Sequence, residues 1–285
     1  MTNIGNIEIQ DLFVGSNNAV GLYQGAVVVW EKSAPLGDWL CFTSEEANST
    51  VAMEANGSAP TVSLEYSTDG NTWSPFVVGT TTVTLANIGD KVYVRANSAG
   101  NTGMGTSSSN YNKFVMTGKI AASGDVDTLL DQNGNATLTN YCYESMFLDC
   151  TSLTSAPELP ATTLATGCYY GIFQNCTSLT TAPALPATTL TNYCYTQMFQ
   201  NCKSLTTAPS LPATTLATGC YQNMFRGCTN LTSIDVRFTA WNPGGYATAG
   251  WVYGVAESGT FTCPSTLPDT RGTSNIPTGW TKVAA

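Results

Sequence analysis

The sequence predicts a multidomain chain with a β leader, a small all-β sandwich, and an α/β repeat solenoid with an aromatic C-terminal cap. Two observations predict this order: a 26-residue repeat in the second half of the 285 residues, and short runs of alternating apolar residues in the first half. The composition indicates what the core and the surface are made of, since 42% of residues are hydrophobic but only 10% are charged. The chain can therefore bury a core, and its surface must consist mainly of uncharged polar side chains.

Two series of cysteines mark the repeat, each with a step of 26 residues, and the second series follows the first by eight residues. The letters TNY and ATG alternate before the first cysteine of successive units. A fixed period of this length predicts stacked units. The first series is Cys142, Cys168, Cys194 and Cys220, and the second is Cys150, Cys176, Cys202 and Cys228.

Each unit divides into two segments. Residues 168–176 carry apolar side chains at four-residue intervals, which predicts a two-turn helix with one core-facing side. The following segment contains Pro183 and Pro186, which exclude a helix, so we expect a strand and an extended return with inward leucines. A helix and a strand in each unit are the organisation of leucine-rich repeats.

The string F-x-x-C-T-S-L-T with its following leucine-proline turn resembles the BspA-like leucine-rich repeats of bacterial surface proteins. Its 26-residue version looks like the surface-protein repeat of gut Bacteroidales and of their phages. The resemblance covers residues 138–235 and implies a solenoid over 118–235 that displays an adhesive surface. Pro209 is followed 26 residues later by Asp235, so the last unit decays as a capping unit would.

The column cysteines are predicted to be buried hydrophobes rather than disulfides. Eight residues along a helix span about 12 Å, whereas a disulfide needs Cα atoms within about 7 Å. Equivalent cysteines on adjacent helices would be roughly 8–10 Å apart, which is also too far. Cys41 and Cys263 stand outside the columns, and whether they pair stays open.

Residues 34–117 carry strand and turn signals without a repeat. Residues 61–76 predict a hairpin, because Val62, Leu64 and Tyr66 alternate before a tight turn at Asp69-Gly70. With further strands nearby, the segment is predicted to form a small β-sandwich that resembles immunoglobulin or fibronectin type III modules.

The two ends differ from the middle of the chain. Residues 1–33 hold β-type runs that are too short to bury their own apolar side chains, so they must pack on another surface. Tyr23 and Trp30 are its predicted anchoring residues, and the segment resembles the leaders of phage structural proteins. Residues 236–285 are expected to form a hydrophobic lid over the last unit, with an aromatic ligand platform as the alternative.

The sequence excludes several function classes. Without histidine there is no Ser-His-Asp triad, Cys-His dyad or HExxH zinc site, and we expect no catalytic residue, metal or cofactor. Asp131, Asn133 and Asn135 begin like a calcium loop, but Ala136 and Cys142 replace its glycine and glutamate, so a loop-capping role is expected. The net charge of −9 disfavours nucleic acid, and no segment is apolar enough for a membrane span.

The expected function is a phage virion structural protein, a head fibre or a capsid or tail decoration, located on the virion surface. It would attach to other virion proteins and form a homo-oligomer, expected to be a trimer, through its leader. Variable positions Glu158, Ala184 and Ser210 are the expected contacts with a host surface protein or glycan. The alternative is a bacterial cell-surface adhesin, which would need a signal peptide that the N-terminus does not show.

Overall fold

The computed structural model describes residues 39–241 and 245–285, and the backbone of six short strands between Asn3 and Glu31. The chain divides into two compact units, Met1–Asp38 and Trp39–Ala285. In the first unit, β1 (Asn3–Ile4), β3 (Val14–Gly15) and β5 (Gly21–Gln24) pair antiparallel with β2 (Ile7–Glu8), β4 (Asn18–Ala19) and β6 (Val27–Glu31). The side chains of the expected anchors Tyr23 and Trp30 lie outside the described residues.

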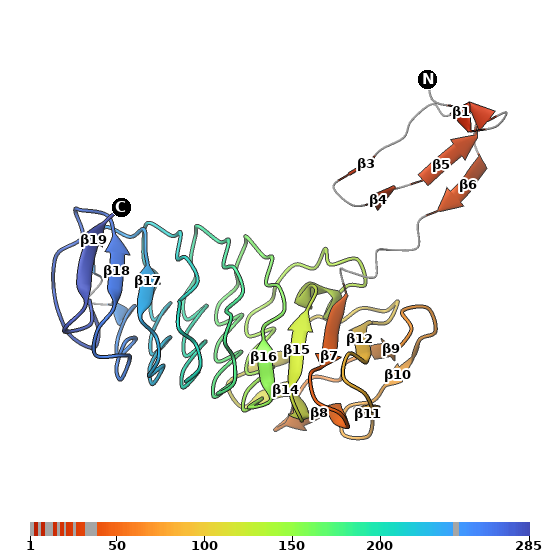
Figure 1. The fold of residues 1–285 in the computed structure, drawn as a ribbon, viewed down its shortest axis with the longest axis horizontal. Helices are drawn as coiled ribbons and strands as arrows, with labels where there is room; N and C mark the ends of the chain where they lie inside the picture. Colours follow the sequence, from red (N-terminus) through yellow and green to blue (C-terminus); the bar gives the residue numbers. More distant parts are fainter. Residues whose placement is uncertain are drawn as a thin grey trace. The chain divides into compact units, whose positions relative to one another are not determined.

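The second unit begins with two facing sheets (Figure 1). One has the strand order β10-β9-β12-β7-β15-β16 and the other β11-β8-β14-β13. The strands are β7 (Leu40–Ser44), β8 (Ser49–Asn56), β9 (Leu64–Ser67), β10 (Ser74–Phe76), β11 (Thr82–Leu85), β12 (Lys91–Ala96), β13 (Gly105–Ser107), β14 (Asn110–Thr117), β15 (Ile120–Ser123) and β16 (Leu153–Ser155).

The core between these sheets follows the period of two along the strands. Val92 and Val94 of β12 are fully buried, and Phe42 of β7 meets Phe114 of β14 with 4.8 Å between ring centroids. The predicted hairpin is confirmed, because β9 and β10 pair antiparallel around the turn at residues 68–73. Asp69 Oδ1 closes that turn by accepting the backbone N–H groups of Asn71 and Thr72.

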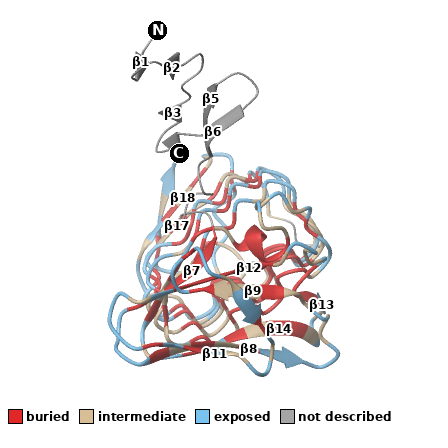
Figure 2. Ribbon diagram, turned by 90° about the vertical axis from the view of Figure 1, so that its right-hand side faces the viewer, coloured by how far each residue is buried: buried red, intermediate tan, exposed pale blue. Residues whose placement is uncertain are grey.

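The sandwich continues into the repeats without a break in the core. β15 pairs antiparallel with β7 on one side and parallel with β16 of the first repeat on the other. Phe114 also stacks on Phe147 of the first repeat at 5.3 Å. In the chain between β15 and the first repeat, the Asp125 side chain caps the 3-10 turn η1 (Val126–Leu129) by accepting the N–H of Asp127. The core of the second unit therefore extends from the sheets into the stack of repeats (Figure 2).

The expected α/β leucine-rich-repeat solenoid is wrong, because the repeats contain no α-helix. Residues 168–175 form a run of turns, and the helical assignments in the described part of the chain are 3-10, at η1 and at Gly245. Gly167, Gly171 and Asn175 adopt positive φ values of 61°, 59° and 63°, which interrupt any helix every fourth residue. The five apolar side chains of this segment are nonetheless buried, as expected for a core-facing side: Cys168, Tyr169, Ile172, Phe173 and Cys176.

The backbone hydrogen bonds show why turns replace the helix. Tyr170 N–H donates to the carbonyl three residues earlier, of Gly167, at 3.0 Å. The neighbouring Gly171 and Phe173 instead donate to Thr196 and Met198 of the next repeat, at 2.8 and 3.0 Å. Alternate N–H groups therefore bond within a repeat and between repeats, which satisfies the buried backbone and ties successive repeats together.

Aromatic side chains form two ladders through the stack. Tyr143, Tyr169, Tyr195 and Tyr221 stack at 5.6, 5.9 and 6.1 Å, and the phenylalanines from Phe147 to Phe225 stack at 5.4, 5.7 and 5.8 Å. All these rings are essentially fully buried. The ladders supply the largest fully buried side chains of the repeats.

The alternation of TNY and ATG has a direct structural cause. The Tyr141 ring lies where a side chain on Gly167 would be, since a Cβ on that glycine would come within 2.5 Å of it. Tyr193 covers Gly219 in the same way, at 2.4 Å. A tyrosine in one repeat therefore requires glycine in the next, and the structural period is two repeats.

The C-terminal segment closes the stack. β17 (Ser233–Asp235), β18 (Thr260–Cys263) and β19 (Thr281–Ala284) form a parallel sheet at the end of the molecule (Figure 1). Trp251 and Phe261 are fully buried against the last repeat, and Trp280 is 3% exposed. This burial fits the lid rather than the aromatic ligand platform.

Candidate functional site

The proline-containing segment of each repeat presents one side chain to solvent between two buried ones. In the first repeat Pro157 and Leu159 are buried, whereas Glu158 is exposed. The equivalent Ala184 and Ser210 are also exposed. The three positions predicted to make contacts thus occupy the same outward place in successive repeats.

Hydrogen bonds hold the first and third of these positions, through the backbone at Glu158 and through the side chain at Ser210. Glu158 N–H donates to the Gly124 carbonyl at 2.8 Å, and the Glu158 carbonyl accepts from Val126 at 3.3 Å. The Glu158 carboxylate has no hydrogen bond or ion pair within the described residues, so it is open to a ligand. Ser210 Oγ donates to Asp235 Oδ2 at 3.4 Å, and Asp235 also pairs with Arg237. The Ser210 hydroxyl therefore already has a hydrogen-bond partner within the protein.

A shallow hollow joins two of the three positions. Its volume is about 350 Å³, and Glu158, Ala184, Pro160 and Pro186 contribute to its walls. A neighbouring hollow of about 400 Å³ shares Pro160 and is bounded by Thr162 and Thr163. The structure thus brings Glu158 and Ala184 together and leaves Ser210 outside the hollow.

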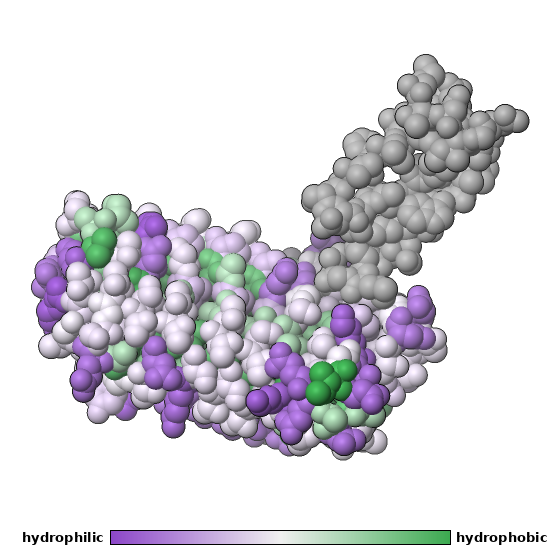
Figure 3. All heavy atoms as spheres, viewed as in Figure 1, coloured by the Kyte–Doolittle hydropathy of each residue, from purple (hydrophilic) through white to green (hydrophobic). Residues whose placement is uncertain are grey.

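The chemistry of this face is that of a contact surface. Prolines, alanines and threonines supply methyl groups and hydroxyls, and Glu158 supplies one carboxylate at the rim. The stack has mostly intermediate hydropathy on the face shown in Figure 3. Within the described residues, no group of three or more acidic or cysteine side chains is placed to hold a metal ion.

Glu144 is the described carboxylate in the most unusual surroundings. It is fully buried at the junction of the sandwich and the first repeat, and neither carboxylate oxygen has a hydrogen-bond partner in the described chain. Burial raises its pKa to about 8, so the group is largely protonated at neutral pH. Burial raises the pKa of Tyr111 and of Tyr170, and the nearby Glu144 carboxylate, when ionised, raises both further. The sequence identified Glu144 as a carboxylate but gave no sign of its burial.

All ten cysteines are free and buried, as expected for the two columns. The second column also has a polar role, since Cys176 Sγ donates to the Phe147 carbonyl of the preceding repeat at 3.1 Å and Cys228 Sγ to Phe199 at 2.9 Å. Burial raises the pKa of Cys150 and Cys228 to about 12, which suppresses thiolate chemistry. Cys41 and Cys263, whose pairing the sequence left open, are both unpaired.

The sandwich carries a hollow that the sequence did not predict. The loop after β12 and the loop after η1 meet around a hollow of about 460 Å³ that is lined by amide side chains. The sequence assigned Asp131 and Asn133 to loop capping, and Asp131 Oδ1 does accept the Asn133 N–H at 3.2 Å. The hollow could not be foreseen, because its two walls are roughly 30 residues apart in sequence.

Comparison with family models, with curated proteins and with solved structures gave no significant match. No helix in the described part of the chain has the length and hydropathy of a membrane span.

Proposed function

We propose that this chain is a structural protein of a phage virion, a head fibre or a capsid or tail decoration that displays its repeats to the host surface. The observation that carries the proposal is the structural difference between the two compact units. The described backbone of the first unit forms short antiparallel strand pairs, whereas the second unit has an extensive core and presents Glu158, Ala184 and Ser210 at equivalent exposed places.

The leader is the proposed attachment segment. Short strand pairs with few residues are marginal in isolation, and such segments gain stability by adding strands to a partner's sheet. Pairing among leaders from several copies would give the homo-oligomer, with a trimer as the proposed form. Other virion proteins are the second class of partner for this segment.

The repeat stack is the proposed contact surface. Its backbone is tied between repeats by hydrogen bonds, so its shape is set before any ligand arrives. Substitution at Glu158, Ala184 or Ser210 leaves the buried columns untouched, which lets the surface vary without loss of the fold. A host surface protein or a glycan is the proposed target.

Imaging of purified phage particles with an antibody raised against residues 138–235 tests the location. We expect the label on the particle surface at regular sites. Label confined to the bacterial envelope, with unlabelled particles, would contradict the virion assignment and favour a cell-surface adhesin.

A further inference from the structure

The hollow between the two loops of the sandwich has preorganised walls. Asn101 joins the loops, because its backbone N–H donates to Leu130 O and its Nδ2 to Leu129 O, each at 2.8 Å. Its Oδ1 accepts the Ser63 N–H at 2.7 Å. Gly100 allows the close approach, since a Cβ there would lie 2.9 Å from the Leu130 carbonyl.

Several polar groups around the hollow remain available to a ligand. Asn97 Oδ1 accepts the Ala99 N–H at 2.9 Å, but its Nδ2 has no partner within the described residues. Asp131 uses Oδ1 for Asn133, whereas its Oδ2 has no partner there. The walls thus offer both a donor and an acceptor at fixed places.

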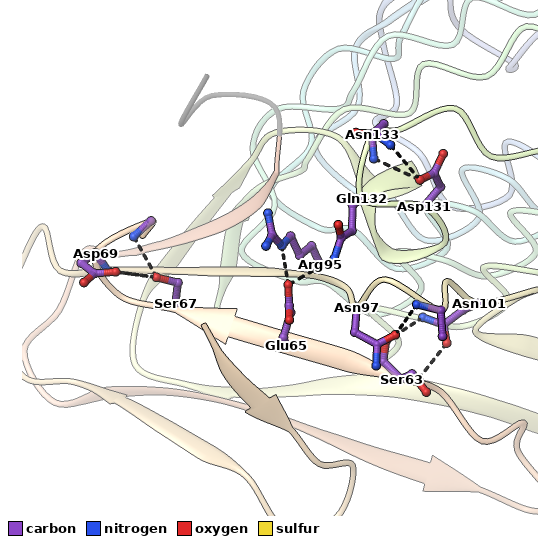
Figure 4. A network of polar contacts seen from close by, with 12 residues as sticks. Ser63, Glu65, Ser67, Asp69, Arg95, Asn97, Asn101, Asp131, Gln132 and Asn133 are labelled. Carbon is purple, nitrogen blue, oxygen red and sulfur yellow. Dashed lines mark hydrogen bonds and ion pairs between the residues drawn. The ribbon is translucent and has the colours of Figure 1, made fainter. Parts of the chain in front are cut away.

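Gln132 is oriented by a chain of contacts across the sheet (Figure 4). Its Nε2 donates to Glu65 Oε1 at 3.3 Å, and the same oxygen accepts Arg95 Nε at 2.7 Å. The Arg95 guanidinium lies 3.6 Å from the centre of the Trp73 ring. The contact with Trp73 positions Arg95, and Arg95 positions Glu65. Because Gln132 uses its Nε2 for Glu65, its Oε1 stays an acceptor with no partner in the described chain.

We propose that this hollow binds a neutral saccharide unit. Its volume of about 460 Å³ falls within the usual range for small-molecule sites. The Asn97 amide offers a donor, and the Asp131 carboxylate and the Gln132 amide oxygen offer acceptors, which match the hydroxyls of a sugar ring. The charge selects against acidic ligands, because Asp131 is the one charged residue among the described residues that line the hollow, and the nearby Arg95 is already paired with Glu65.

The site lies on the sandwich, separate from the face of the repeats assigned above, and does not depend on the virion location. It gives the chain a second place of contact with glycans. Asp131, Gln132 and Asn97 are its proposed ligand-binding residues.

The test exposes the full chain to immobilised neutral and acidic glycans, followed by titration of the best neutral saccharide in solution. We expect neutral saccharides to bind and acidic ones not to. Gln132→Ala and Asp131→Ala should each weaken binding by roughly fivefold, the loss of one hydrogen bond. Glu46→Gln, an exposed carboxylate of the sandwich outside the hollow, is the matched control and should bind normally. Glu158→Gln is tested beside it to report binding at the repeat face.

Thermal unfolding of each variant confirms that the fold is intact. The proposal is overturned if no neutral saccharide binds the full chain, or if the loop variants bind as well as the unmodified protein. Loss of binding in Glu158→Gln alone would place the glycan on the repeats instead, which would support the proposed adhesive face while refuting this site.

Discussion

Glu144 occupies the repeat position that Tyr170, Thr196 and Gln222 fill in the later units. Those side chains carry no charge at neutral pH, whereas Glu144 must be protonated to pack without a partner. Its folded pKa of about 8 lies above the value of roughly 4.3 for an unfolded chain. The folded protein therefore binds more protons than the unfolded one between these values, and its stability must fall as pH rises through that window.

We predict that Glu144→Gln removes this pH dependence. Between about pH 5 and pH 8 the unmodified protein should lose up to ~1.4 kcal/mol of unfolding free energy per pH unit relative to the variant. Urea unfolding at several pH values measures the difference. Parallel curves for the two proteins would show that the carboxyl is not protonated in the fold.

Gly167 offers a second test at the residue scale. Gly167→Ala should destabilise more than Gly79→Ala, because both glycines have positive φ but only Gly167 faces a ring, that of Tyr141. The control should cost about 1 kcal/mol, from backbone strain alone. Adding Tyr141→Ala to Gly167→Ala should recover about 1 kcal/mol, which a double-mutant cycle from chemical denaturation measures. Additive effects would mean that ring and glycine do not constrain each other.

At the scale of the element, residues 168–176 show what a sequence pattern can and cannot predict. The four-residue spacing correctly identified the buried side chains but not the backbone that carries them. A run of turns with a left-handed residue every fourth place buries the same positions as a helix. Gly167, Gly171 and Asn175 at that spacing were the signal for turns, because these residue types tolerate positive φ.

The same limit applies to the sites. The exposure of Glu158, Ala184 and Ser210 followed from the repeat, since one pattern places all three. Neither the buried Glu144 nor the amide-lined hollow could be foreseen, because each depends on contacts between the sandwich and segments distant in sequence. The repeat pattern therefore predicts which side chains are buried or exposed within the repeats, but not the contacts where the repeats meet the sandwich.

The buried ladders predict the cost of a single truncation. Phe173→Ala should destabilise the protein by roughly 3–5 kcal/mol, because the ring is fully buried between Phe147 and Phe199 and its loss leaves a cavity. Chemical denaturation measures the change. A loss below about 1 kcal/mol would contradict the packed ladder.

Whole repeats should be removable. Deleting residues 168–219 removes two repeats and keeps the Tyr141–Gly167 contact and the packing of the last repeat against the lid. Deleting residues 168–193 removes one repeat and places Gly219 opposite Gly167, where Tyr193 was. Both chains should fold, because each repeat bonds mainly to its neighbours, and the first should retain the tyrosine–glycine alternation. Limited proteolysis and thermal unfolding compare them. An aggregated or protease-labile product from the 52-residue deletion would refute the stacked arrangement.

At the scale of the whole molecule, the two compact units suggest separate tasks. The second unit has a continuous core from Leu40 to Trp280 and can be expected to fold alone. The leader contains short strand pairs, which are marginally stable by themselves, so we expect its stability to come from contacts with partner chains. Assembly and display are then properties of different parts of the chain.

Removal of residues 1–33 tests this division most directly. Light scattering and binding to purified particles should be measured for the full chain and the truncated chain side by side. We predict that the full chain oligomerises and decorates particles, and that the truncated chain is a folded monomer that does neither. A truncated chain that still assembles and decorates particles normally would contradict the account, because attachment would then reside in the sandwich or the repeats.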